Sequence, residues 1–529
     1  MKRSSRVLLP SLALLLATAG TAPGAASQAT GALDTLRTRA ERTDYVETTR
    51  YADVVAFLEQ VAAASPRAHL ATMGYTSEGR AIPLLVVGDV TDASPESVRD
   101  SGKLRVYLQG NIHGGEVPGK EALLMLVRDL LREGGTRWME ELVLLVAPVY
   151  NADGNERVAL TNRPRQNGPL GGMGQRPNAQ GLDLNRDHMK LDSPEARSLV
   201  RMLTAYDPHV GVDLHTTNGT RHAYHLTYSP PLHPGTAEEI VGLLRGEALP
   251  GITRRIRERD GWHFYYYGNA MGRGGELGWY TFDHRPRFNN NYLGLRNRVA
   301  ILSEAYAYAT FRDRVMATRR FVEEILDWAA GDGDGIRAAI RAAEAPVVGR
   351  VLPVRAAFQG SEGTVEILMG EVEELRHPYT GEVVLNRLDV ITPTPMREYG
   401  TFGGTDFEAV PAWYVIPPEV EAAVDRLLAH GVPLVSNPGP RTAEVEIFRM
   451  DSTSVAARPF QGHQERTIHG RWVAERRTIA AGTWMVDVSH PLGRLAFYLL
   501  EPRSDDGLAN WALLDEHLTG EEYPVWRIR

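Results

Sequence analysis

Cysteine is absent from the 529 residues of this chain. Its absence excludes disulfide bonds, thiolate metal ligands, a cysteine nucleophile and a lipid-anchored N-terminal cysteine. Any metal site must therefore be built from histidine, aspartate and glutamate. Lysine is scarce as well, because it occurs only at positions 2, 103, 120 and 190, so arginine carries nearly all of the positive charge.

Long charge runs of a single sign are also missing. The net charge is −8 at pH 7, which disfavours nucleic acid and anionic surfaces as partners. Apolar residues make up 43% of the chain and charged residues 23%, the balance of a folded globular protein. A chain of this length is expected to form two or three domains.

The first 26 residues have the pattern of a secretory signal peptide. Cations at positions 2, 3 and 6 precede an apolar run from Val7 to Ala19, and small residues follow that run. The run is too short for a typical membrane anchor, and Pro10 interrupts it. We therefore expect a secreted or periplasmic protein with no integral membrane segment once the signal is removed.

Two regions with different patterning follow the signal. Residues 45–330 alternate strand-like and helix-like runs, which predicts an α/β fold with a mixed, mostly parallel sheet sandwiched by helices. Residues 345–529 contain short β-branched runs with turn dipeptides and predict a smaller β-rich domain. No chemical role follows for that second domain, so bracing of the first is the default expectation.

The stretch "GNIHGGEVPGKEALL" places His113 and Glu116 between a strand-like run (103–113) and a helix-like run (118–135). Catalytic zinc takes three protein ligands and leaves a fourth position open. Sites in open α/β sheets lie at the carboxyl ends of strands, where these two residues are expected. The spacing alone is common, so an ordinary polar turn is an equal alternative at this point.

Two later strands end in polar residues of the same kind. His215 closes the strand-like run 209–217 and could be a third ligand or a buried structural histidine. Asp213 lies two residues earlier, on the same strand face, and could orient it. Glu304 interrupts the apolar run 298–308, where a carboxylate is costly unless it is paired or functional. Burial would raise its pKa toward the range of a general base, whereas an ion pair with a nearby arginine (Arg296 or Arg298) is the structural alternative.

Arginines concentrate between these strands. Asn185 and Arg186 stand side by side in "GLDLNRDH", a combination that suits a substrate carboxylate; the alternative is an ion pair with Asp183 or Asp187. The loop "NADGNERVALTNRPRQNGP" adds three more arginines, any of which could stabilise an oxyanion: Arg157, Arg163 and Arg165.

The motifs follow one another in the order S-x-E-G-R, H-x-x-E, N-x-D-G, an arginine loop, D-L-N-R, a strand histidine and a strand glutamate. This order resembles that of the zinc carboxypeptidase family (peptidase family M14, carboxypeptidase A-like) over about residues 45–325. The C-terminal stretch resembles the tails of secreted bacterial members. The resemblance implies one Zn²⁺ per chain and hydrolysis of a peptide bond next to a free C-terminal carboxylate by metal-activated water. The substrate is then a peptide or peptide-like molecule.

The resemblance also implies roles for individual residues. His113, Glu116 and His215 are the expected zinc ligands, Glu304 is the general base and then the acid, and Asn185 with Arg186 binds the substrate carboxylate. Arg165, in "PRQN", is the expected oxyanion arginine, with Arg163 as its rival. The capping tyrosine of the family has no clean match; Tyr292 is preferred over Tyr280 because it is nearer to Glu304 in the sequence.

Three questions stay open at this point. The paired glycines of "HGGE", where the family often has bulky or charged residues, could widen one side of the site. The same metal ligands and clamp would also serve an amidase or deacylase of N-acyl amino acids or cell-wall peptides. A catalytically inactive binding protein is a third reading, which predicts a broken ligand or base, and none is broken here.

Overall fold

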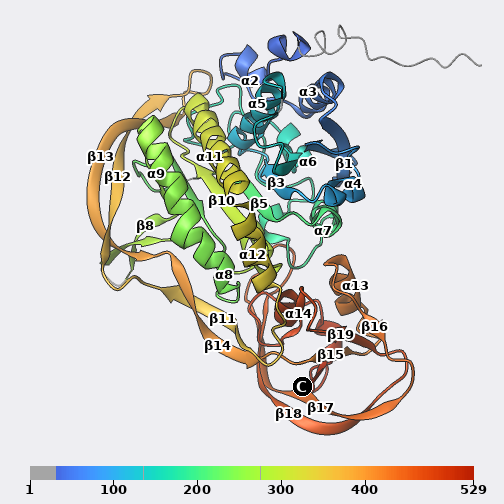
Figure 1. The fold of residues 1–529 in the computed structure, drawn as a ribbon. Helices are drawn as coiled ribbons and strands as arrows, with labels where there is room; N and C mark the ends of the chain where they lie inside the picture. The colour runs from blue at the N-terminus through green and yellow to red at the C-terminus, as the bar shows by residue number, and fades with distance from the viewer. Residues whose placement is uncertain (1–30, 135, 218, 274–275) are drawn as a thin grey trace, which may run out of the picture.

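The computed structural model describes residues 31–134, 136–217, 219–273 and 276–529 (Figure 1). The expected signal peptide, residues 1–26, lies outside these ranges. Among the described residues, no helix combines the length and the apolar character needed to span a bilayer.

An eight-stranded mixed sheet forms the centre of residues 45–330, named the catalytic region after the expectation from the sequence, in the order β1-β2-β4-β3-β5-β10-β6-β7. Four of its seven strand pairs are parallel, and three are antiparallel. This confirms the predicted α/β class. Its strands are β1 (Ala68–Tyr75), β2 (Ala81–Val87), β3 (Leu104–Gly110), β4 (Leu142–Ala147), β5 (Val210–Thr216), β6 (Leu226–Ser229), β7 (Phe264–Tyr266) and β10 (Val299–Ala305).

Helices cover both faces of this sheet, which explains why its central strands are apolar on both sides. One face packs against α3 (Tyr51–Ala64), α5 (Pro118–Arg132), α8 (Glu238–Gly242), α9 (Leu249–Asp260), α11 (Phe311–Gly331) and α12 (Gly333–Ala343). The other face packs against α4 (Pro95–Asp100), α7 (Pro194–Tyr206) and α10 (Asn289–Leu295). Short helices α2 (Arg39–Arg42) and α6 (Ala152–Glu156) lie in the connections.

The C-terminal region is β-rich and contains three further sheets. The first pairs β11 (Val351–Gln359) with β14 (Thr401–Ala409), and the second joins β12 (Thr364–Arg376) and β13 (Val383–Tyr399) to β8 (Asn269–Arg273) and β9 (Glu276–Tyr280). The third contains β15 (Trp413–Ile416), β16 (Val435–Ser436), β17 (Arg441–Val455), β18 (Arg466–Ile479), β19 (Trp484–Asp487) and β20 (Trp526–Ile528). Helices α13 (Glu421–Ala429) and α14 (Gly493–Leu500) pack beside it.

The C-terminal region does not stand apart from the catalytic region. One hydrophobic cluster runs from strand residues of the central sheet, such as Leu145, through α7 to Tyr414 and α14. The β12–β13 hairpin returns to the catalytic region, where β13 pairs in parallel with β9. In Figure 1 this hairpin curves around the outside of α9. The two regions therefore share a core and a sheet.

Candidate metal centre and catalytic site

Three adjacent parallel strands bring the polar residues together. β3 pairs with β5, and β5 pairs with β10, all in parallel. His113 follows the end of β3, whereas His215 and Glu304 lie near the ends of β5 and β10 and are direct partners in the register. Because the carboxyl ends of parallel strands meet at one edge of the sheet, residues almost 200 positions apart in the chain become neighbours.

His113, Glu116 and His215 form a compact buried cluster. Their candidate ligand atoms all lie within 4.8 Å of one another. The Glu116 carboxylate joins the two imidazoles: its Oε1 is 2.9 Å from His113 Nδ1 and its Oε2 is 2.9 Å from His215 Nδ1. All three residues are at most 3% exposed. Such a dense polar group in a buried position is costly unless it has a function.

A second layer of carboxylates orients both imidazoles. His113 Nε2 lies 3.0 Å from Asp183 Oδ1, and His215 Nε2 lies 2.9 Å from Asp213 Oδ2. Gln109 in turn donates to Asp213 at 3.0 Å. A carboxylate on Nε2 fixes the ring and increases the basicity of Nδ1, as it does for histidines that bind metals. The Nδ1 atoms of both rings therefore face one point.

This donor set suits a divalent metal ion. Two imidazole nitrogens and one carboxylate are the ligand types of catalytic zinc sites without cysteine, and the outer carboxylates supply the usual support. Burial alone would raise the pKa of Glu116, but the Arg163 and His113 charges hold this pKa well below its usual range. Glu116 is therefore negatively charged, as a carboxylate that binds a metal ion must be.

Glu304 lies on the strand next to His215. Its Oε2 is buried and has no hydrogen-bond partner among the residues that the structure describes. Burial, supported by the Glu116 charge and opposed by that of His215, raises the pKa of Glu304 above that of an ordinary glutamate. The two arginines considered as ion-pair partners bind elsewhere: Arg296 donates to the His430 carbonyl oxygen, and Arg298 pairs with Asp207. The structure therefore favours a functional reason for the carboxylate.

The paired glycines of "HGGE" are required by close backbone contacts and do not widen the site. A Cβ atom at Gly114 would lie 2.3 Å from the Gly154 carbonyl carbon. A Cβ atom at Gly115 would lie 2.5 Å from the Gly174 carbonyl oxygen and 3.0 Å from Cγ of Arg163. The Arg163 side chain thus fills the space beside Gly115 and forms an ion pair with Glu116.

The expected carboxylate clamp lies on the other side of the cluster. Asn185 and Arg186 belong to a short 3-10 turn, η1 (Leu184–Arg186). The Asn185 side-chain oxygen accepts from the Asn289 N–H at 2.9 Å, which fixes the amide. The Arg186 guanidinium lies 3.9 Å above the ring of Phe288 and 3.9 Å from Asp183 Oδ2. One nitrogen of the Arg186 guanidinium donates to the Asn185 carbonyl oxygen, and its ion pair with Asp183 is long, so among the described residues the other nitrogens could still bind an external carboxylate.

Of the loop arginines, the structure brings Arg163 and an unexpected residue, Arg176, to the cluster. Arg176 lies 3.7 Å from Glu116 Oε1 and donates to Asp183 Oδ2 from two nitrogens, at 3.0 and 2.8 Å. Arg165 is exposed, and its side chain makes no hydrogen bond or ion pair with the described residues. The sequence signal for Arg176 was present, because "RPN" (176–178) repeats the Arg-x-Asn spacing of Arg165 and Asn167.

The expected capping tyrosines also lie away from the cluster. Tyr292 is fully buried, and its hydroxyl is 2.7 Å from His430 Nδ1. Tyr280 stacks on Tyr399 with ring centroids 4.2 Å apart. By contrast, burial and the Glu304 charge raise the pKa of a third tyrosine, Tyr267, whose hydroxyl accepts from the Asn269 side-chain amide at 3.2 Å. Sequence reasoning missed Tyr267 because it lies in the run "FYYYG", where no single tyrosine stands out.

The C-terminal region reaches the metal cluster through the turn between β17 and β18. Gln461 Oε1 accepts from the backbone N–H of Asp183 at 2.8 Å. Two residues later, His463 Nε2 lies 2.7 Å from Asp192 Oδ2. The backbone of Asp183, the residue whose carboxylate contacts His113, is thus held by a residue almost 280 positions away. No short motif in the sequence carries this contact.

Together, a buried His–Glu–His set, a free carboxylate and a clamp for anions define a site of the metallohydrolase class. Residues 54–208 match the family model described as zinc carboxypeptidase. This matched region, which carries the first motifs of the predicted order, is of the zinc carboxypeptidase family, and together with the relatives below it indicates a metallocarboxypeptidase-type hydrolase.

Individual relatives match different shares of the chain. Carboxypeptidase 2 of Trichophyton tonsurans is 24% identical over 86% of this chain and 81% of its own length. The carboxypeptidase N catalytic chain of Mus musculus is 33% identical over 27% of this chain and 31% of its own. Carboxypeptidase A from Helicoverpa armigera, a solved structure, is 17% identical, with a TM-score of 0.40 over 60% of this chain and 80% of its own.

Proposed function

We propose that this protein is an exported, zinc-dependent carboxypeptidase that removes residues from the C-terminal end of peptides. The observation that carries the proposal is the position of Arg186 close to the cluster. Arg186 lies 3.9 Å from Asp183, and the Asp183 carboxylate contacts His113. A substrate carboxylate at Arg186 would place the adjoining peptide bond near the metal ligands. Export is supported by the signal-like pattern of the first 26 residues.

One Zn²⁺ per chain would be held by His113, Glu116 and His215. Bound there, the metal supplies Lewis-acid chemistry, because it polarises a carbonyl and makes a water molecule more acidic. Asp183 and Asp213 keep the two imidazoles in the orientation that this requires. The absence of a thiolate ligand suits a hydrolytic rather than a structural zinc site.

Glu304 is proposed as the general base and then the general acid. Its unpartnered Oε2 can accept a proton from the attacking water and return it to the nitrogen of the leaving residue. A raised pKa favours the first step, because the Glu304 carboxylate is then a stronger base toward the attacking water and holds the proton until the leaving nitrogen takes it. General acid–base catalysis of this kind contributes roughly 10²–10⁴-fold to the rate.

Cationic side chains stabilise the negative charge that develops on the scissile carbonyl. Arg176 is proposed for this role in place of Arg165, because it lies at Glu116 and is held by two bonds to Asp183. Asn185 and Arg186 bind the terminal carboxylate of the substrate. Tyr267, near Glu304, is proposed to close over the bound residue.

Substrate comparison tests this function. Purified protein loaded with Zn²⁺ should hydrolyse an N-blocked dipeptide with a free C-terminal carboxylate much faster than the same dipeptide with a C-terminal amide. A chelator should abolish the activity, and Zn²⁺ should restore it. Equal rates on both dipeptides would contradict the role of the clamp, and release of the acyl group from N-acyl amino acids alone would favour a deacylase.

A further inference from the structure

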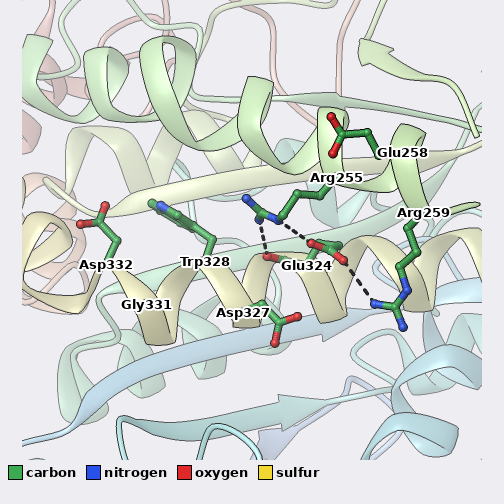
Figure 2. A pocket seen from close by; sticks show the side chains of 8 residues that line it. All are labelled: Arg255, Glu258, Arg259, Glu324, Asp327, Trp328, Gly331 and Asp332. Carbon is green, nitrogen blue, oxygen red and sulfur yellow. Dashed lines mark hydrogen bonds and ion pairs between the residues drawn. The ribbon is translucent and has the colours of Figure 1, made fainter.

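A surface hollow between α9 and α11 has a volume of about 720 Å³ (Figure 2). Its charged side chains pair with each other, because Glu324 accepts from Arg255 at 2.8 Å and lies 3.7 Å from Arg259. Both arginines of this hollow therefore already have a carboxylate partner. Packing of the two helices explains the hollow, and we assign no ligand to it.

A different cavity, of about 400 Å³, lies where the C-terminal region meets the catalytic region. The catalytic region contributes residues of the loop from Pro231 to Thr236 and of α8, and the C-terminal region contributes Thr401 and Phe402 at the start of β14. The volume falls within the range of roughly 300–1,000 Å³ that is typical of ligand sites. None of the lining residues belongs to the metal cluster or to the carboxylate clamp, so this cavity is a separate space.

Apolar side chains form much of the lining of this cavity. They come from both regions and are Pro231, Leu232, Pro234, Val241 and Phe402. An apolar surface of this kind favours contact with an apolar group of a ligand over contact with water. The remaining lining is polar, and a few polar groups in an apolar pocket are what fixes the orientation of a ligand.

His233 offers a hydrogen-bond donor in this lining although it is only 4% exposed. Its Nδ1 accepts from the Gly235 N–H at 2.9 Å, and burial lowers the pKa of the ring to about 3, so the ring is neutral. A neutral ring that accepts at Nδ1 carries its hydrogen on Nε2. This Nε2 makes no hydrogen bond with the described residues, and it is not among the unpartnered atoms that are sealed from solvent. The protein therefore leaves one reachable donor without an acceptor.

Two opposite charges without ion-pair partners complete the lining. Arg245 donates to the Gly400 carbonyl oxygen at 2.8 Å and lies 4.9 Å from the ring centroid of Tyr266, but no carboxylate among the described residues pairs with it. Glu238 is exposed, and its side chain makes no hydrogen bond or ion pair with the described residues. A guanidinium is a strong partner for a carboxylate, and a carboxylate is a strong partner for an ammonium group.

We propose that this cavity binds a free amino acid with an apolar side chain. The carboxylate of the amino acid pairs with Arg245 and accepts from His233 Nε2, and its ammonium group pairs with Glu238. The apolar side chain packs against the proline, valine and phenylalanine side chains of the lining. Free amino acids are also what the proposed reaction releases, but the inference does not depend on that reaction, because its test measures binding and not hydrolysis.

Calorimetric titration with L-leucine tests the proposal in full-length protein that carries Arg186→Gln. This background removes the clamp, which would otherwise compete for the carboxylate. We expect one saturable site for L-leucine. N-acetyl-L-leucine lacks the ammonium charge and L-leucinamide lacks the carboxylate, so each should bind at least about tenfold more weakly, the effect of one lost hydrogen bond to a charged group. Equal affinities for the three compounds, or no saturable binding of L-leucine, would overturn the proposal.

Two glycines in one helical segment provide matched variants. Gly242, at the end of α8, lines the cavity, whereas Gly246, in the π-helical turn Leu243–Ala248 that follows, does not. Both are exposed and have open space where a Cβ atom would lie. In the Arg186→Gln background, Gly242→Trp should weaken the binding of L-leucine more than tenfold, and Gly246→Trp should leave it unchanged.

A third variant, Arg245→Gln, repeats the test if Gly242→Trp does not fold. It removes the partner of the carboxylate, so L-leucine and L-leucinamide should then bind with similar affinity. Wild-type affinity for L-leucine in folded Gly242→Trp, or an undiminished preference for L-leucine over L-leucinamide in Arg245→Gln, would overturn the proposal.

Discussion

Replacement of Arg176 by alanine tests the oxyanion role that the structure moves away from Arg165. Arg176 is preorganised by bonds of 3.0 and 2.8 Å to Asp183 and lies 3.7 Å from Glu116. Removal of one such donor typically lowers kcat by roughly 10²–10³-fold, which corresponds to about 2.7–4 kcal/mol. Because 40% of the Arg176 side chain is exposed, water screens its charge, and we expect a loss near the lower end, about 100-fold.

The assay is steady-state hydrolysis of an N-blocked dipeptide, with the zinc content of each variant measured in parallel. The loss should appear mainly in kcat, because the interaction strengthens in the transition state. Arg176→Lys should recover only part of the rate, since a single ammonium cannot reproduce the guanidinium fork. Arg165→Ala should cost a few-fold at most. A large loss in Arg165→Ala beside a small loss in Arg176→Ala, at equal zinc content, would refute the assignment.

Three further predictions concern the surroundings of the site and the C-terminal region. Gln461→Ala removes the acceptor of the buried Asp183 N–H and should weaken zinc binding about tenfold in a chelator competition. A tenfold change is the lower end of the effects known for residues that support metal ligands. The control variant Gln464→Ala changes an exposed residue of the same turn and should leave zinc binding unchanged. Gly115→Ala forces a Cβ atom to within 2.5 Å of a carbonyl oxygen and should lower the free energy of unfolding by about 1–3 kcal/mol in thermal unfolding. Gly363 has open space around it, so Gly363→Ala should leave the stability unchanged. Burial raises the pKa of Glu501 from 4.5 to about 7, so folding takes up a proton in this range. The contribution of the protonated Glu501 to the free energy of unfolding is fully present below the pKa of the unfolded state. It is lost as the pH rises through about 7, and the free energy of unfolding then falls by up to about 3 kcal/mol. Glu501→Gln should therefore make the fall in Tm between about pH 5 and pH 8 shallower; an unchanged slope would contradict this assignment.

The sequence indicated the central strands of the sheet and the residues at its carboxyl edge, but not the short strands β6 and β7. The strands that carry or precede His113, His215 and Glu304 are rich in apolar residues. A parallel sheet brings the ends of such strands together, and the family resemblance then indicated which polar residues there form the cluster. Helix α9 was missed because Pro250 and four arginines obscure its apolar spacing.

The remaining parts of the site depend on contacts between distant segments. Arg165 and Arg176 precede asparagine at the same spacing, and only the folded loop shows which of them faces Glu116. Tyr292 is close to Glu304 along the chain, but its hydroxyl contacts His430 in the core, whereas Tyr267, on a different segment, has a pKa that the Glu304 charge raises. Proximity in the sequence was therefore the wrong guide to proximity at the site.

The C-terminal region shows the same limit on a larger scale. Its composition predicted a β-rich domain that braces the first, and its β-rich character is present. Composition could not show that the β17–β18 turn contacts Asp183, or that the β12–β13 turn closes a cavity beside Arg163. Both contacts join segments more than 200 residues apart, and such pairings leave no periodic signal in a single sequence.

Zinc content and peptide hydrolysis, measured together on wild-type protein and on Glu304→Gln, test most directly whether this site is a metallopeptidase centre. Glutamine preserves the size of the side chain and removes its ability to take up a proton. We expect about one zinc per chain in both proteins and a loss of kcat of roughly 10²–10⁴-fold in Glu304→Gln. Zinc absent from the wild type, or unchanged activity in a zinc-loaded Glu304→Gln, would contradict the assignment.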